Sequence, residues 1–253
     1  MFKLFIFAVL LIADKCSSQD KHYTTANAHS HNDYEKQYPF YKAWENHFGS
    51  IEADIFLYKG KLIVAHDSIQ LVQKRTLDSL YLMPLQLCIR KNGGYVYADK
   101  KRSLQLMIDI KSEAVPTLNK LIETIEKFKT LNNTSSLKIV ISGNRPASSQ
   151  FNSYPSWILF DGELQKNYLP AELKKIVLLS DNFAQYSLWK GTGEIPEKDK
   201  LVLRQLIDKV HRSGKKIRFW NAPDTPDSWK AFMAIGVDYI NTDKIDELTK
   251  YLN

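Results

Sequence analysis

The chain has 253 residues, which at roughly 100–200 residues per domain allows one large domain or two small ones. Apolar residues make up 44% and charged residues 25%, which are ordinary globular values that exclude a disordered or collagen-like chain. Lysine and arginine number 35 against 28 aspartates and glutamates, so the formal charge is +7. This excess is spread along the chain. It suits a protein that meets anionic groups, but it does not predict a nucleic-acid partner.

Residues 1–18 are expected to be an export signal. Lys3 precedes an uncharged apolar run at 4–13, which is too short for a ~20-residue membrane span and has the length of a signal-peptide core. Cleavage after Ser18 would release a mature domain of residues 19–253 into the periplasm or the medium. In a second interpretation, Cys16 carries a lipid anchor, and in a third the run is a buried N-terminal helix.

The cysteine content is too low to hold a fold together. Only Cys16 and Cys88 are present, and removal or lipidation of Cys16 leaves Cys88 alone. Neither a disulfide framework nor a thiolate metal site is therefore expected.

Short apolar segments of strand composition recur along the chain, and several are the near-continuous runs typical of strands buried on both faces. Stripes at helical spacing lie between many of them, for example at 118–128, 202–210 and 226–233, and a further helix is expected at 39–48. This alternation predicts a single (β/α)₈ TIM barrel, with a doubly wound open sheet as the structural alternative. The eight strand segments are 25–29, 50–57, 104–110, 137–142, 157–160, 176–180, 216–220 and 239–241.

Two acidic side chains interrupt the second apolar segment. Glu52 and Asp54 are two residues apart, so in a strand they point to the same face and converge. Two carboxylates there repel each other unless they are protonated or bridged by a cation, and oxygen ligands suit Ca²⁺ or Mg²⁺. The alternative is a half-exposed strand whose acidic side chains face water.

Further polar residues stand where strands end. His29 closes the first segment, and His66 ends an apolar run that returns after a turn at Lys59-Gly60. Asp109 and Lys111 share one face at the end of the third segment. Asp109 would suit as a third metal ligand, and Lys111 as a partner for a phosphoryl oxygen. The alternative is that the two form a plain ion pair at the strand end. The residues that follow His29, at 31–33, are interpreted as caps of the local turn.

Four motifs resemble those of the glycerophosphodiester phosphodiesterase and phosphatidylinositol-specific phospholipase C-like superfamily. They occur in the same order, and the segment 236–243 is similar to the closing strand of those enzymes. The motifs are Ala28-His29, Ile51-Glu52-Ala53-Asp54, Val64-Ala65-His66-Asp67 and Ile108-Asp109-Ile110-Lys111.

The resemblance implies a (β/α)₈ barrel that cleaves phosphodiesters with one divalent cation. Carried over by motif, His29 and His66 would be the acid–base pair, with His29 favoured as base and His66 as acid. The metal ligands would be Glu52, Asp54 and Asp109.

The chain departs from the glycerophosphodiesterases at two places. Ser30-His31-Asn32 replaces the Arg-Gly that follows their first histidine, and Asp109-x-Lys111 is more similar to the sphingomyelinase D-type branch. Both departures leave the head group open. Lys111 and Arg145 would assist at the phosphate, and Trp220, at a strand end, would stack on a head group or fill the barrel mouth.

These observations favour an exported, metal-dependent phosphodiesterase that acts on glycerophosphodiesters or phospholipid head groups, with no nucleic-acid partner. Contact with a membrane surface is compatible with this substrate class. The choice between hydrolysis and cyclising cleavage is left open, and so is the oligomeric state.

One alternative is an amidohydrolase-like metal hydrolase, which His29-x-His31 suggests but which would need further histidines on later strands. Another is a non-catalytic barrel that binds a phosphate ligand.

Overall fold

The structure is a computed structural model that describes residues 22–253. The predicted signal at 1–18 and its Cys16 lie outside these residues. Within the described part, no helix combines the length and the apolar character needed to cross a bilayer.

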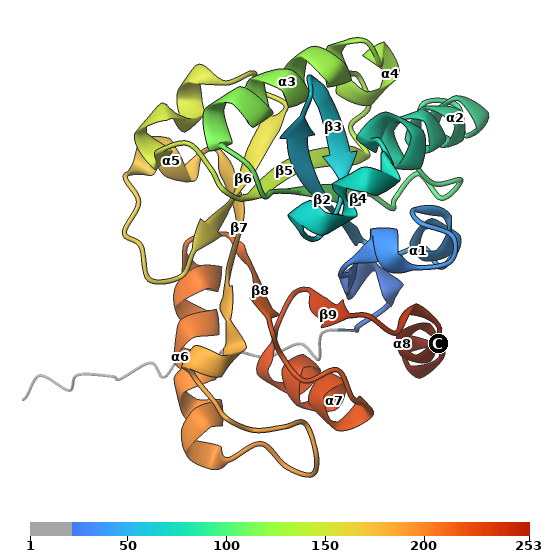
Figure 1. Cartoon of the computed structure of the whole chain (residues 1–253). Coiled ribbons are helices and arrows are strands. Elements are labelled where there is room, and N and C mark those ends of the chain that lie inside the picture. The colour runs from blue at the N-terminus through green and yellow to red at the C-terminus, as the bar shows by residue number, and fades with distance from the viewer. Residues whose placement is uncertain (1–21) are drawn as a thin grey trace, which may run out of the picture.

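A strand forms in each of the eight predicted segments, although in the first only Ala28 and His29 belong to it, because residues 25–27 form a 3₁₀ turn. A ninth strand returns antiparallel to the second as the Lys59-Gly60 turn predicts. Helices lie outside the ring of strands, with α6 and α7 across it from α2 and α3 (Figure 1). The strands are β1 Ala28–Ser30, β2 Ser50–Tyr58, β3 Lys61–Val64, β4 Leu104–Ile110, β5 Leu137–Gly143, β6 Ile158–Glu163, β7 Ile176–Asn182, β8 Lys216–Trp220 and β9 Ile240–Thr242.

The eight parallel strands make a nearly closed barrel, which confirms the predicted TIM barrel. They follow one another in the order β8-β7-β6-β5-β4-β2-β1-β9. A single parallel bridge between Arg218 on β8 and Tyr239, which directly precedes β9, joins the first and last strands of this order. The carboxyl ends of the strands therefore meet at one mouth, where active sites of this fold lie.

The helices agree with the stripes in the sequence except in the first connection. There the helix predicted at 39–48 ends at Glu45, because His47 adopts the left-handed region with φ of 56° and turns the chain toward β2. The α-helices are α1 Tyr41–Glu45, α2 Met83–Lys91, α3 Ala114–Glu126, α4 Lys129–Asn132, α5 Pro170–Leu173, α6 Glu197–Arg212, α7 Pro226–Ile235 and α8 Ile245–Leu252. Short turns are η1 Thr25–Asn27, η2 Asp33–Glu35, η3 Ser68–Gln73, η5 Ser148–Ser153 and η6 Phe183–Gln185, and η4 Asp78–Leu82 is a π-helical turn.

The barrel interior is apolar at one level. Met107, Val140, Leu178 and Tyr239 form a small buried cluster separate from the main core, which lies between the strands and the helices. Because side chains alternate along a strand, the residues two positions later face the interior again, one pleat nearer the mouth. Those residues begin the polar part of the barrel.

Gly49 is required where the chain enters β2. A Cβ atom there would lie 1.9 Å from the backbone oxygen of Ala26. We expect Gly49→Ala to lower the free energy of unfolding by up to about 3 kcal/mol, since the backbone must shift. Gly193→Ala is the control, because its Cβ meets open space and only the positive φ of 65° is strained, at about 1 kcal/mol. Urea unfolding measures both, and equal losses would contradict the steric explanation.

Candidate active site

The polar level of the barrel opens into a cavity of about 370 Å³. Asp109, Ser142 and Ser180 lie two residues beyond the apolar interior residues of β4, β5 and β7, and all three line this cavity. The rest of its lining comes from the ends of other strands and the loops that follow them. These residues are His31, Asn32, Glu52, Asp54, His66, Lys111, Gly143, Arg145, Asp161, Gly162, Glu163, Asp181, Arg218 and Trp220.

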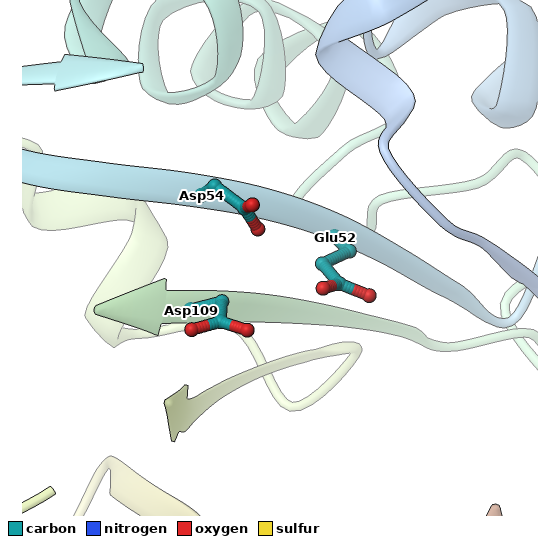
Figure 2. Close-up of side chains that lie close together, drawn as sticks. All are labelled: Glu52, Asp54 and Asp109. Atoms are coloured by element: carbon teal, nitrogen blue, oxygen red, sulfur yellow. The ribbon is translucent and has the colours of Figure 1, made fainter. Parts of the chain in front are cut away.

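Three carboxylates converge at the cavity floor. Glu52 and Asp54 project from β2 and Asp109 from β4, and the three groups point toward one another (Figure 2). One oxygen from each lies within 4.8 Å of the others. Asp54 and Asp109 are paired in register, which explains why the third ligand comes from the adjacent strand.

The carboxylates have capacity left for a cation. The Oδ1 atoms of Asp54 and Asp109 are buried and have no hydrogen-bond partner. Burial and the neighbouring Glu52 raise the pKa of Asp54 to about 6. The ammonium of Lys111 lies 3.0 Å from Asp54 Oδ2 and 3.2 Å from Asp109 Oδ2, so a positive charge is already stabilised here. Oxygen donors of this kind fit Ca²⁺ or Mg²⁺.

His29 lies below the cavity and not on its surface. It is fully buried, its Nδ1 is 2.7 Å from Ser50 Oγ, and its Nε2 is 2.7 Å from Glu52 Oε2. Burial, followed by the charge of Arg218, lowers the pKa of His29 to about 4. The ring is thus held between strands with both nitrogens engaged, and it does not border the space for a substrate.

His31 occupies the position at the mouth that was expected for His29. It follows β1 and lines the cavity. Its Nδ1 is 3.3 Å from the carboxylate of Asp243, which follows β9. Burial alone would lower the pKa of His31, but the hydrogen bond to Asp243 and the charge of Glu52 outweigh it and raise this pKa.

His66 contacts the carboxylate cluster directly. It follows β3, and its half-exposed ring lies with Nδ1 3.1 Å from Asp54 Oδ2. The hydroxyl of Tyr34 donates to the same oxygen at 2.8 Å. Both cavity-lining histidines thus lie next to the carboxylate cluster, His66 in contact with Asp54 and His31 within the influence of the charge of Glu52.

Comparison with known proteins bears on this geometry. The model of the AIM6-like phosphodiesterase domain matches residues 18–144, just over half of the chain. The chain belongs to this AIM6-like phosphodiesterase family. A model of the Glycerophosphoryl diester phosphodiesterase family matches residues 216–246.

Individual AIM6-like relatives are distant but cover most of the chain. Altered inheritance of mitochondria protein 6 of Kluyveromyces lactis is 27% identical over 89% of this chain and 72% of its own length. The homologue from Arthroderma benhamiae is 24% identical over 88% of this chain and 82% of its own length. A solved glycerophosphodiester phosphodiesterase from Parabacteroides distasonis has a TM-score of 0.55 at 17% identity, covering 89% of this chain and 96% of that one, and supports the fold.

The remaining predicted residues of this AIM6-like domain also border the cavity. Arg145 donates to the carbonyl oxygen of Asp161 and forms a 3.0 Å ion pair with Glu163. Trp220, at the end of β8, is partly exposed on the rim. With Lys111 among the carboxylates, the predicted substrate-binding residues thus share one cavity with the predicted metal ligands.

Two buried charged residues of the cavity were missed by sequence reasoning. Arg218 on β8 places Nη1 3.0 Å from Glu52 Oε2 and Nη2 4.0 Å from Asp161 Oδ2. Asp161 on β6 accepts hydrogen bonds from the hydroxyls of Ser142 and Ser180. The sequence did contain a signal for Arg218, because a charged residue stands in the middle of the predicted strand at 216–220.

Removal of Arg218 should destabilise the AIM6-like fold in a pH-dependent way. Burial alone would raise the pKa of Glu52, but Arg218 and His29 outweigh it and hold this pKa below its usual range. A depressed carboxyl pKa contributes stability above the unfolded pKa of about 4.3, and this contribution is lost as the pH falls. Arg218→Met should therefore cost about 3–5 kcal/mol at pH near 7 and less below pH ~4.

Urea unfolding at both pH values provides the measurement. Arg204→Met is the matched control, because Arg204 is exposed on the outer helix α6. We expect its effect to stay within about 0.5 kcal/mol. An Arg218→Met penalty of equal size at both pH values would contradict the electrostatic origin.

Proposed function

We propose that this protein is a divalent-cation-dependent phosphodiesterase that acts on glycerophosphodiesters or phospholipid head groups. The observation that carries the proposal is the carboxylate cluster of Glu52, Asp54 and Asp109, flanked by His31 and His66 on one cavity. Membership of a phosphodiesterase domain family supports the reaction class.

The cavity carries the charges that a phosphodiester requires. A divalent cation held by the three carboxylates would act as a Lewis acid toward a non-bridging phosphoryl oxygen. Lys111, Arg145 and Arg218 all line the same cavity, and their charges would bind and orient the phosphate. Arginine is suited to this task because its planar donors match phosphate oxygens.

Proton transfer falls to His31 and His66 in this proposal, with His31 in place of His29. Each ring borders the cavity and each contacts a carboxylate that fixes its orientation, Asp243 for His31 and Asp54 for His66. The two imidazoles would divide the acid and base roles at the attacking and leaving oxygens. His29 instead supports Glu52 from below.

Two rival functions have less support. An amidohydrolase-like site needs several histidine ligands, whereas the ligand cluster found within residues 22–253 consists of carboxylates alone. A non-catalytic binding barrel would not need two histidines that line the cavity and are each oriented by a carboxylate. Export through residues 1–18 stays a prediction from the sequence.

The activity is testable with a panel of phosphodiesters followed by ³¹P NMR, which reports the bond cleaved and any cyclic product. We expect release of an alcohol in the presence of Ca²⁺ or Mg²⁺, loss of activity with a chelator and recovery when the cation is restored. His31→Asn and His66→Asn should each lower kcat about 10²–10⁴-fold, because each removes one proton transfer.

His22→Asn is the matched control, since His22 is exposed and lies outside the cavity. His29→Asn should lower the melting temperature, whereas the two cavity histidine variants should keep it. Chelator-resistant turnover, or full activity in His31→Asn or His66→Asn, would refute the mechanism.

A further inference from the structure

An apolar pair protrudes beside the cavity. Ile69 and Val72 lie on the 3₁₀-helix η3, and each is 80% exposed. Residues three apart on a 3₁₀-helix eclipse one another, so the two side chains form one apolar face. Two β-branched aliphatic side chains exposed together are unusual for a surface that faces only water.

The element that carries this pair is held in place and is tied to His66. Asp67 caps it by accepting hydrogen bonds from the amides of Ile69 and Gln70. The side chain of Gln70 accepts from the His66 amide at 2.7 Å and donates to Glu35 at 3.1 Å. These hydrogen bonds therefore hold the apolar face in a fixed position next to His66, which lines the cavity.

Unpaired lysines on the segments that adjoin η3 complement an anionic surface. Lys74 follows the helix directly, and the β2–β3 hairpin, whose strand β3 pairs with the segment after η3, carries Lys59 and Lys61. None of these lysines forms an ion pair within residues 22–253. Of the acidic groups near η3, Glu35 pairs with Arg75 and Asp67 caps the helix. Tyr38, in the same loop as Glu35, is 61% exposed, and tyrosine is favoured where an apolar phase meets water.

We propose that η3 docks onto an anionic phospholipid bilayer, with Ile69 and Val72 inserted among the acyl chains and the lysines against the head groups. Shallow insertion of this kind gains from buried apolar area and from attraction to anionic lipid together. Because η3 follows His66, docking brings the cavity to the membrane surface. This inference rests on the proposed function in one respect, since it takes the substrate of the cavity to be carried by a membrane lipid.

A tryptophan placed on the pair reports insertion directly. With vesicles of phosphatidylcholine and phosphatidylserine, the emission of Val72→Trp should shift to shorter wavelength and be quenched by brominated acyl chains. Leu201→Trp is the matched control, since Leu201 is 52% exposed on the outer helix α6, and its added emission should not change. Val72→Trp emission that stays unshifted and unquenched would overturn the proposal.

Vesicle sedimentation then tests the contribution of the pair. Ile69→Ser with Val72→Ser should lower the partition coefficient at least about tenfold, because two aliphatic side chains no longer leave water. Leu87→Ser with Leu201→Ser, on exposed helix positions, should leave it unchanged. Vesicles of phosphatidylcholine alone should bind less protein.

Both readouts are independent of turnover, so they can succeed or fail whether or not the phosphodiesterase assay does. The alternative partner of the apolar face is a second copy of the chain. Sedimentation velocity without vesicles measures this self-association. Self-association that Ile69→Ser and Val72→Ser abolish, without any vesicle binding, would overturn the proposal in favour of a dimer contact.

Discussion

The ion pair between Arg218 and Glu52 lies inside the barrel, where neither charge meets bulk water. An isolated charge is costly to bury, so each group depends on the other and on its hydrogen bonds. Arg218 also reaches Asp161 and Asn241, which connects β8 to β2, β6 and β9. The same contacts that stabilise the interior therefore fix the orientation of Glu52, and with it one side of the carboxylate cluster.

The position of this pair follows from the two levels of the interior. Met107, Val140 and Leu178 fill the barrel with apolar side chains, and the next inward residues of the same strands are Asp109, Ser142 and Ser180. The apolar level closes the barrel below the site. Charges above it are thereby kept in a confined, poorly solvated space, in which electrostatic interactions are stronger than in water.

Local patterns were sufficient to predict the strands and the face shared by Glu52 and Asp54, because apolar runs and alternation are properties of a single segment. They could not predict which residue reaches the mouth, since depth in a barrel depends on the stagger between strands. His29 and His31 share a face, and only the register with Ser50 shows that His29 lies one level too deep. Asp161 was missed because β6 continues through an irregularity after Phe160, where the apolar run ends.

The charge balance of the mouth favours the binding of a cation. Within residues 22–253, the carboxylates of Glu52, Asp54, Asp109 and Asp161 form ion pairs with Arg218 and Lys111, and Arg145 is partly engaged by Glu163. Four carboxylates and two bases leave two negative charges uncompensated. Burial, followed by the charge of Glu52, raises the pKa of Asp54 to about 6, and a proton and a metal ion would compete for the same oxygens. One divalent ion bound to these carboxylates would restore neutrality, with the charge of Lys111 counted in the balance.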